Sequence, residues 1–555
     1  MIDTTTGDGA VAPSTAEGPG EPGPPSVSPD ESSAPGGSAG KRPPGSVAIA
    51  LALAAMVLVG VGAVMLADVI AAEPEATLVG NNAPVNDGAG DPMDLSSHNS
   101  PVVARNPTDA ANVVVANRKD NPDFGCALHV STDGAASFSA TSLPVPEPQE
   151  SKCFAPDVGF GPDGRLYVLF VTLRGQGNRP HAVWLSTSDD GGQTLSEPTR
   201  LLGELSFQVG LTVDPEQPGQ LYVTWLDAED TATLAFPDTG YPIRFMTSDD
   251  GGDTWSEPVA VSDPARERVV APRLAVGAEG HLQLVYLDLG QDRLDWAGGH
   301  EGYGGPPYPD EWELVAARSG DGGATWEETS VGTLRPPKRI LVFLPEFPTL
   351  AVDRERDRLY AAYHARVDGD ASVWLWRSED GGDTWEGPVE VDGAAPGDGT
   401  DQYLPQVDVA PTGRVDVVYY DRQADDANVM NEVALASSHD AGASFTTHRT
   451  VSDRAFDSRI GFGGHRDMAD LGSRLGLLST TDRALAVWSD TRAGTEASEK
   501  QDLVRQAVAF DGAVTAPAGA TAALRFGGTA VAVVGGALLV WRVGSWWRRR
   551  RGETT

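Results

Sequence analysis

The sequence predicts an all-β fold in which similar four-stranded sheets follow one another around a ring. Three observations support this prediction. A short turn with the pattern Ser-x-Asp-x-Gly-x-Thr-Trp occurs six times in the 555-residue chain, at intervals of 57 to 71 residues, which suit one sheet with its loops. Proline-led apolar segments such as APDVGF and APRLAV open most repeat units, and a second β-rich segment such as RLYVLFV follows in each unit.

The repeated turn consists of residue types that close a tight loop. Its fullest copy is TSDDGGDTW, residues 247–255. Ser and Asp side chains can satisfy backbone N–H groups in such a loop, Gly allows a positive φ, and the final aromatic residue can pack under the next sheet. We therefore expect a structural role, not a catalytic one, for the Asp of each copy. These residues are Asp133, Asp190, Asp250, Asp321, Asp380 and Asp440.

The six copies resemble the Asp-boxes, also called bacterial neuraminidase repeats, of sialidase-like β-propellers. The resemblance covers about residues 98–511. It implies a propeller whose Asp-boxes lie on one rim and whose ligand site lies at the opposite rim, around the central channel. It also implies an activity of exo-α-sialidase type, in which an acidic glycan is bound and hydrolysed. Propellers carry many unrelated functions, so a non-catalytic cell-surface scaffold that binds a protein or a polymer is the alternative.

The number of sheets follows from the mismatch between turns and strands. Seven segments have the pattern of a second strand, against six turns. A ring closes when the N-terminal segment supplies the outer strand of the last sheet, and that sheet then lacks the turn between its third and fourth strands. Here DLVRQAVAF, residues 502–510, is the expected third strand and ATLVG, near residue 76, the fourth. We therefore favour seven blades over six, with the propeller spanning residues 76–511.

Two apolar segments flank the repeats. Residues 46–72 are long enough to span a bilayer, with Lys41 and Arg42 before them, and residues 524–543 end next to a Trp pair and an arginine cluster. The basic flanks predict that both termini are cytoplasmic and that the propeller lies outside the cell membrane; a cleaved signal peptide is the alternative for the first segment. The remaining expected parts are a disordered tail at 1–45, a linker at 512–523 and a basic tail at 544–555.

Charge and cysteine content limit the partners. The formal net charge of −38 disfavours nucleic acid as a partner, and no acidic run has the spacing of a known calcium loop, so no cofactor is predicted although Ca²⁺ stays an open alternative. The two cysteines, Cys126 and Cys153, lie in neighbouring repeat units. An extracytoplasmic location favours a disulfide between them over two buried thiols.

Candidate ligand-binding residues follow the second strands. Arginine and aspartate recur in these loops, and a Gly-rich segment at 461–477 adds His465 and Arg466. Arginines around one opening can bind a carboxylated or sulfated ligand, whereas an ion-paired rim between blades is the alternative. The candidate ligand-binding residues are Arg118, Arg174, Arg366, Arg422, Arg466, Arg492, His465 and Asp490.

The resemblance also implies catalytic residues. Sialidases use three arginines on the substrate carboxylate, a Tyr nucleophile assisted by Glu, and an Asp acid/base. Tyr420 lies at a suitable strand end with Glu432 downstream, and Asp421 lies next to it, so these three are the catalytic candidates. The Arg-Ile-Pro signature that carries the first arginine in the family is absent from this sequence.

Overall fold

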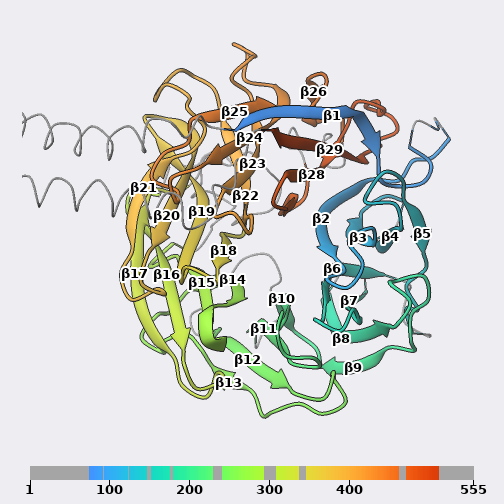
Figure 1. The fold of residues 1–555 in the computed structure, drawn as a ribbon, viewed down its shortest axis with the longest axis vertical. Coiled ribbons are helices and arrows are strands. Elements are labelled where there is room, and N and C mark those ends of the chain that lie inside the picture. Colours follow the sequence, from blue (N-terminus) through green and yellow to red (C-terminus); the bar gives the residue numbers. More distant parts are fainter. Residues whose placement is uncertain are drawn as a thin grey trace, which may run out of the picture. The chain divides into compact units, whose positions relative to one another are not determined.

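Each repeat unit forms a four-stranded antiparallel sheet, and seven such sheets surround a common axis (Figure 1). The computed structural model describes residues 74–511, apart from residues 90, 92, 123, 147–151, 176–178, 229–240, 293–307, 337–345 and 462–469. Within a blade the chain runs from the innermost to the outermost strand, as in the order β6-β7-β8-β9. The protein is therefore an all-β, seven-bladed propeller.

The blades are numbered in chain order from the first complete sheet. Blades 1 to 3 consist of β2 (His98–Arg105), β3 (Val113–Lys119), β4 (Gly125–Ser131), β5 (Ser139–Thr141), β6 (Cys153–Phe160), β7 (Leu166–Arg174), β8 (Arg179–Ser188), β9 (Thr199–Leu202), β10 (Ser206–Val213), β11 (Leu221–Asp227), β12 (Ile243–Ser248) and β13 (Val259–Ala260). Blades 4 to 6 consist of β14 (Val269–Val276), β15 (Leu282–Asp288), β16 (Trp312–Ser319), β17 (Glu327–Leu334), β18 (Thr349–Asp353), β19 (Arg358–Val367), β20 (Asp370–Ser378), β21 (Glu386–Glu390), β22 (Gln402–Val409), β23 (Val415–Asp421), β24 (Met430–Ser438), β25 (Thr447–Thr450) and the short β26 (Phe456–Asp457). Blade 7 consists of β27 (Gly476–Ser479), β28 (Arg483–Asp490), β29 (Asp502–Asp511) and β1 (Glu75–Pro84).

The ring is closed by the N-terminal strand. β1 pairs antiparallel with β29, with Thr77 opposite Ala509, so the two ends of the described chain share one sheet. Figure 1 shows the blue β1 beside the dark red β29. The prediction of seven blades, and of the two segments that complete the last one, is confirmed. The physical reason is that a ring of sheets needs no uncovered first or last blade when both chain ends contribute to one sheet.

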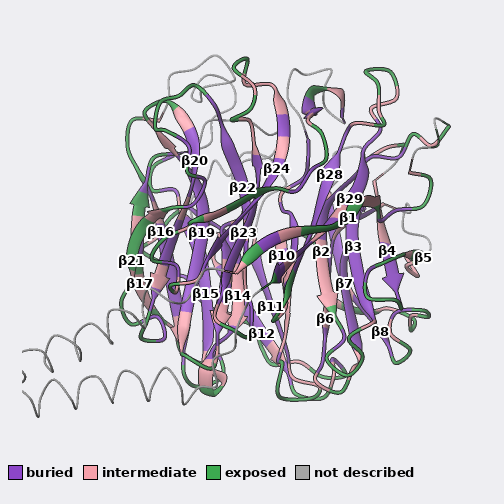
Figure 2. Ribbon diagram, turned by 45° about the horizontal axis from the view of Figure 1, so that its top comes forward, coloured by how far each residue is buried: buried purple, intermediate pink, exposed green. Residues whose placement is uncertain are grey.

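The core lies between neighbouring blades. The second strands are buried along most of their length, and in β7 every residue but the last is buried. Because both faces of a blade are covered by its neighbours, these strands are apolar on both sides and do not alternate with polar residues. Figure 2 shows buried residues along the inner and middle strands and exposed residues in the loops and outer strands such as β21. A fully buried residue such as Phe170 contributes about 1.5–3 kcal/mol.

The proline-led segments form a bulge in the innermost strands. In blade 4 the register with β15 shifts between Val270 and Arg273, and Ala271 at this point has a φ of 61°. A bulge inserts one extra residue and bends the strand, and proline can follow because the ladder is already interrupted there. Blades 1, 2, 3 and 6 repeat this feature. The equivalent residues with positive φ are Ser100, Ala155, Gln208 and Leu404.

The repeated turns close by one set of local hydrogen bonds. In the third copy, Ser248 Oγ donates to Asp250 Oδ1 at 2.8 Å, the backbone N–H of Gly252 donates to Ser248 Oγ, and both the backbone N–H and the hydroxyl of Thr254 donate to Asp250. The hydrogen bonds from Thr254 and Ser248 lower the pKa of Asp250 to about 2. Some copies also join blades: the Asn112 amide donates to Gly191 O at 3.0 Å. The turn is therefore a structural clasp.

The predicted transmembrane helices are corrected by the structure. Among the described residues no helix is long and apolar enough to cross a membrane, and the helical segments there are the single turns η1 (Ala278–Gly280) and η2 (Ser458–Ile460). The apolar segments described are strands of at most ten residues, covered by neighbouring blades. Both predicted spans, 46–72 and 524–543, lie outside the described residues, as do the two tails and the linker. A membrane contact through two helices therefore has no support in this structure.

Candidate functional site

The two ends of the ring differ in chemistry. The turn rim carries the loops between third and fourth strands, including all six repeated turns; the mouth rim is the opposite end, where second strands finish and first strands begin. In six blades the second strand ends on an aspartate or directly before one, whereas in blade 2 it ends on Arg174. The aspartates are Asp120, Asp227, Asp288, Asp368, Asp421 and Asp490.

Arg118 at the mouth rim is occupied by carboxylates. Its side chain is only 3% exposed, its Nε lies 2.6 Å from Asp120 and its Nη2 lies 2.7 Å from Asp470. Burial raises the pKa of Asp470, and the Arg118 charge acts in the opposite direction. Because Asp470 lies in the segment that leads into blade 7, this cluster joins that segment to blade 1. A buried arginine with two carboxylate partners is a structural connection and does not offer its guanidinium to a ligand.

Arg422 and Arg492 are ion-paired in the same way. Arg422 lies 3.6 Å from Asp401 and donates to the Asn431 side chain at 2.9 Å. Arg492 lies 2.6 Å from Asp490 and also pairs with Asp453, which precedes blade 7. For these two arginines the structure favours the ion-paired rim over the ligand-binding interpretation.

The other predicted ligand-binding residues do not complete a ring. The Arg174 side chain is 57% exposed on blade 2 and lies 3.8 Å from Glu204. Arg366 is half-buried on blade 5, and its backbone N–H donates to Arg335 O at 3.4 Å. His465 and Arg466 lie outside the described residues. The arginines predicted to converge on one opening are therefore distributed among separate contacts.

Tyr420 is not placed as a nucleophile. Its side chain is fully buried, and its hydroxyl donates to Ser489 O at 3.0 Å and accepts from the Ser489 N–H at 3.2 Å. Burial raises the pKa of Tyr420 well above the ordinary value of a tyrosine. Tyr420 pairs with Val433 across the strands while its neighbour pairs with Glu432, so Tyr420 and Glu432 point to opposite faces of the sheet. The structure does not bring the predicted Tyr–Glu pair together.

Asp421 and Glu432 do lie together. They are directly opposite in β23 and β24, and therefore share one face of blade 6. Burial raises the pKa of both carboxyls, and for Glu432 the charge of Asp421 raises it further. Asp421 accepts hydrogen bonds from the Gln423 N–H at 2.8 Å and from Gln402 at 3.2 Å. Two adjacent carboxyls can share a proton, but no arginine of the described chain forms an ion pair with either of them.

Two further arginines lie at the innermost layer of the ring, and the charge of one influences the other. Arg273 lies on the innermost strand β14 and is half-buried, with its guanidinium carbon 4.3 Å from the centre of the Phe347 ring. Arg474 directly precedes the innermost strand of blade 7 and reaches across to blade 2, where it donates to Pro156 O at 2.6 Å. Neither side chain forms an ion pair with a carboxylate in the described part of the chain. We refer to Arg273 and Arg474 as the axial arginine pair.

The axial arginine pair carries excess positive charge. Burial lowers the pKa of Arg273 to about 9; the charge of Arg474 lowers it further and that of Asp157 opposes the change. Burial also lowers the pKa of Arg474, again against the influence of Asp157. The carboxylate of Asp157 accepts from the Leu211 N–H at 3.1 Å and from the Val158 N–H at 3.1 Å, so part of its charge is directed to the backbone. Two guanidiniums near one carboxylate favour an added anion.

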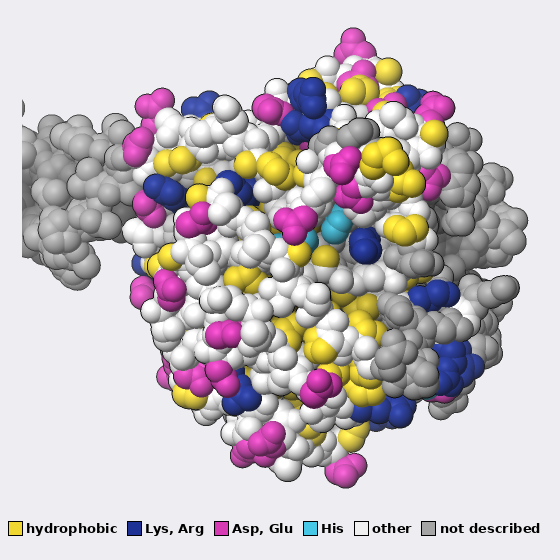
Figure 3. Space-filling model, turned by 90° about the vertical axis from the view of Figure 1, so that its right-hand side faces the viewer, with side chains coloured by type: hydrophobic (Ala, Val, Ile, Leu, Met, Phe, Trp, Pro, Cys, Tyr) yellow, Lys and Arg dark blue, Asp and Glu magenta, His cyan; other side chains and the backbone are white. Residues whose placement is uncertain are grey.

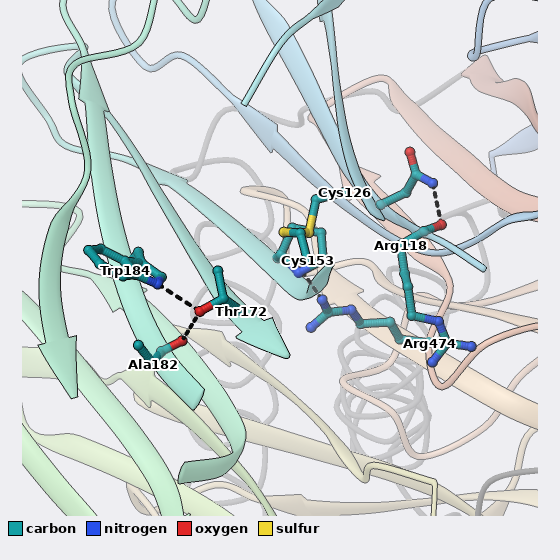
Figure 4. The surroundings of a disulfide bond; sticks show 9 residues. Arg118, Cys126, Cys153, Thr172, Ala182, Trp184 and Arg474 are labelled. Atoms are coloured by element: carbon teal, nitrogen blue, oxygen red, sulfur yellow. Dashed lines mark hydrogen bonds between the residues drawn. A yellow bond between two sulfur atoms is a disulfide. The ribbon is translucent and has the colours of Figure 1, made fainter. Parts of the chain in front are cut away.

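A disulfide stabilises the blade that anchors Arg474. Cys126 of β4 and Cys153 of β6 are bonded, with 5.3 Å between their Cα atoms, which is the pairing that the sequence favours. Figure 4 shows Arg118 and Arg474 beside this bond. Cys153 begins the strand that carries Pro156, the carbonyl acceptor for Arg474. The disulfide therefore fixes the start of the strand that orients one member of the axial arginine pair.

The sequence contained a signal for this pair that our prediction did not use. Arg273 follows the proline of APRLAV, and Asp157 follows the proline of APDVGF, whereas Val102 and Gln406 follow the proline in the equivalent segments. Charged side chains are rarely placed on an innermost, largely covered strand without a reason. Arg474 could not be found in this way, because its partner is a backbone carbonyl two blades away.

No metal site accompanies these residues in the described ranges. Among them, no group of three or more His, Cys, Asp or Glu side chains has an arrangement that would hold a metal ion.

Comparisons with known proteins give only distant structural matches. No family model matches the sequence, and no curated protein matches it. A protein of unknown function from Dyadobacter fermentans is 14% identical, with a TM-score of 0.42, over 79% of this chain and 100% of the other. A Hadza microbial sialidase is 14% identical, with a TM-score of 0.42, over 72% and 74%. A polysaccharide lyase that acts as an ulvan lyase is 10% identical, with a TM-score of 0.45, over 77% and 95%. These values are too low to indicate an activity.

Proposed function

We propose that this propeller binds an acidic glycan whose carboxylate or sulfate rests on the axial arginine pair. The observation that carries the proposal is Arg273: it is half-buried on an innermost strand, burial and the charge of Arg474 lower its pKa, and it forms no ion pair among the described residues. An arginine presents several donors in a planar fork, and two such groups match the oxygens of one carboxylate or sulfate. A bound anion relieves the repulsion between the two cations.

Two further features support a glycan as the ligand. The repeated turns resemble those of sialidase-like propellers, whose substrates carry a carboxylate. The mouth rim around the pair is rich in Asp side chains, and carboxylates can accept hydrogen bonds from sugar hydroxyls. The combination of cations for an acidic group and acceptors for hydroxyls suits an acidic sugar better than a simple inorganic anion.

The binding test uses the full-length chain and calorimetric titration with N-acetylneuraminic acid and galacturonic acid. Arg273→Ala should weaken binding by at least about tenfold, because one charge-assisted contact is lost. Arg273→Lys should retain part of the affinity, since the charge is kept and the fork is lost. Arg483→Ala is the matched control, because that side chain is exposed on the turn rim. Binding that is equal in Arg273→Ala and the wild type would exclude the axial arginine pair as the site.

Hydrolysis of exo-α-sialidase type is the finer form of this proposal. It is supported by the resemblance of the repeated turns and by a cationic site suited to a sialic acid carboxylate. The test is release of a fluorophore from a generic sialoside by the full-length chain, with Arg273→Ala and Glu432→Gln beside it. Turnover that both substitutions reduce would support a hydrolase; binding without turnover would instead favour the alternative of a non-catalytic binding scaffold.

We infer that the propeller acts outside the cytoplasm. The disulfide between Cys126 and Cys153 supports this proposal, because such bonds persist in oxidising compartments. The location can be tested by treating intact cells with a membrane-impermeant protease. Cleavage of the propeller is the expected result, and full protection would contradict the proposal.

A further inference from the structure

The innermost strand of blade 3 has fewer buried residues than any other innermost strand. In β10 only Ser206 and Val209 are buried, whereas most residues of β6 and β14 are buried. Figure 1 shows β10 between these two strands around the centre of the ring. An innermost strand can be exposed only toward the centre, because its own sheet and the neighbouring blades cover its other sides. The wall of the channel is therefore most accessible at blade 3.

A glycine occupies β10 at the position where the innermost strands on either side carry charged residues. A register shift directly precedes this position, which is Asp157 in β6, Gly210 in β10 and Arg273 in β14. The backbone does not require a glycine there, since the φ of Gly210 is not positive. Among the described residues, a Cβ would meet only the Thr224 hydroxyl within 4 Å, at 3.4 Å. The missing side chain leaves a space beside Thr224, which we call the blade 3 gap.

Two hydrogen bonds between β10 and β14 place Arg273 beside this gap. The Ala271 N–H donates to Gln208 Oε1 at 2.7 Å on one side of the gap. The Thr212 hydroxyl donates to Leu274 O at 2.9 Å on the other side. Because Arg273 lies between these two points of attachment, its backbone is at the level of the blade 3 gap.

The anchor of the second arginine lies on the other side of β10. The Asp157 carboxylate reaches from blade 2 and accepts from the Leu211 N–H at 3.1 Å, one residue after the gap. Arg474 donates at 2.6 Å to the carbonyl of Pro156, the neighbour of Asp157. The blade 3 gap is thus flanked by Arg273 and by the anchor of Arg474. A ligand held by the axial arginine pair therefore lies across it.

Thr224 supplies a buried hydroxyl to the gap. It is directly opposite Gly210 in β11, and its side chain is 2% exposed. Tyr222 and Leu226, two residues before and after it, pack in the core between blades 3 and 4, so Thr224 faces blade 4. Blades 2 and 4 have a leucine and a valine at the equivalent position. Among the described residues the Thr224 hydroxyl forms no hydrogen bond, whereas most buried hydroxyls have a partner.

We propose that the blade 3 gap receives a hydroxyl of the acidic sugar that is bound to the axial arginine pair, and that Thr224 hydrogen-bonds to this hydroxyl. The inference rests on the proposed function and adds which acidic ligands the site selects. The space of one missing side chain admits a hydroxyl but not a second sugar ring. Because Arg273 lies beside the gap, the selected ligands carry a hydroxyl close to their acidic group. Gly210 and Thr224 are then specificity-determining residues.

A neutral contact suits the charge of this protein. Asp and Glu side chains are scattered over the outer side of the ring, as Figure 3 shows, and the formal net charge is −38. The overall field of the protein therefore opposes the approach of an acidic ligand. A hydrogen bond between two hydroxyls adds affinity that does not depend on this field.

The experiment compares two ligands that differ only in their hydroxyls. Full-length protein is titrated by calorimetry with galacturonic acid and with tetrahydropyran-2-carboxylic acid, which has the same ring and carboxylate but no hydroxyls. The wild type should bind galacturonic acid at least about fivefold more tightly. This preference should change little between low and high salt, because a neutral hydrogen bond is not screened by ions.

Substitutions at the gap test the two residues separately. Thr224→Val keeps the branched shape and removes the hydroxyl; it should weaken galacturonic acid binding about three- to tenfold and leave tetrahydropyran-2-carboxylic acid binding unchanged. Thr224→Ser keeps a hydroxyl and should retain the preference. Gly210→Ala should remove the preference, because its methyl group occupies the gap. Gly203→Ala is the matched control, since Gly203 lies between β9 and β10 and its φ is not positive.

The outcomes separate this inference from the proposed function. Equal affinity of the wild type for the two ligands, or a Thr224→Val variant that weakens both alike, overturns the role of the blade 3 gap. A Gly210→Ala variant that behaves like Gly203→Ala also overturns it. In these cases the proposed function stands if Arg273→Ala still weakens both ligands. If neither ligand binds, or if Arg273→Ala changes neither affinity, the proposed function fails and this inference fails with it.

Discussion

The turn rim and the mouth rim of this propeller use the same strands in opposite ways. At the turn rim, six loops of nearly one sequence close their polar groups by the same short hydrogen bonds, as Asp250 does with Ser248 and Thr254. At the mouth rim, the second strand ends on or directly before an aspartate in six blades, whereas in blade 2 it ends on the exposed Arg174. Repetition at one rim holds the ring together and leaves the other rim free to vary.

Blade 7 completes the comparison because it lacks the repeated turn. There the turn rim is held by Arg414 of blade 6, which lies 2.9 Å from Asp416 and donates to the carbonyls of Thr480 and Arg483 at 3.1 Å. The Arg414 side chain is 3% exposed and covers the ring of Phe510. A buried ion pair therefore replaces the clasp where the sheet is assembled from both ends of the chain.

The largest expected effect on stability follows from removing the Arg414 side chain. Arg414→Ala leaves the buried Asp416 without its cation, and should lower the free energy of unfolding by about 3–5 kcal/mol. Urea unfolding of the full-length chain measures the loss. Arg483→Ala is the control and should change stability by less than about 0.5 kcal/mol, because that side chain is exposed. A loss below about 1 kcal/mol for Arg414→Ala would mean that blade 7 does not depend on the ion pair.

A somewhat smaller effect is expected at the mouth rim. The double variant Cys126→Ser with Cys153→Ser opens a link with a sequence separation of 27 residues, and should cost about 3–4 kcal/mol in the chain-entropy model. If the strand start that it fixes also orients Arg474, binding of galacturonic acid should weaken in the same variant. Calorimetric titration at a temperature where the variant is folded measures the affinity separately from the loss of stability. Unchanged affinity would show that the disulfide serves stability alone.

The smallest effect concerns a single repeated turn and its response to acid. Hydrogen bonds from Ser137 and Ser131 lower the pKa of Asp133 from 3.8 to about 2. A carboxyl whose folded pKa is depressed stabilises the fold above its unfolded pKa, and this contribution is lost as pH falls from about 4 to 2. Asp133→Asn should therefore lower the free energy of unfolding by less than about 1 kcal/mol at pH 7. Stability should also fall less steeply with decreasing pH in this variant.

Thermal unfolding between pH 2 and 7 measures this contribution of Asp133. The control is Asp249→Asn, which removes an exposed carboxylate beside Asp250. In this control, the decrease of stability at low pH should be the same as in the wild type. If the stability of Asp133→Asn falls as steeply at low pH as that of the control, the ionised carboxylate of Asp133 does not stabilise the turn.

Much of the propeller could be predicted from local sequence. The turn pattern and the apolar second strands were sufficient to place the blades, because each depends on residues close together in the chain. The closing pair β1 and β29 joins distant residues, and it followed from the count of six turns against seven second strands. The flanking transmembrane helices were the part of the fold prediction that the structure corrects.

The candidate site depended on distant residues. Tyr420 has the sequence context of an accessible strand end, yet the packing of blade 7 buries its hydroxyl against Ser489. Arg422 and Arg492 look available in the sequence, but each meets a carboxylate from another loop.

Local patterns therefore identify the blades, since turn closure and strand burial act over a few residues. The tertiary structure decided which cations are paired, because a guanidinium is available to a ligand only where the folded ring brings no carboxylate into an ion pair with it, as holds for Arg273 among the described residues.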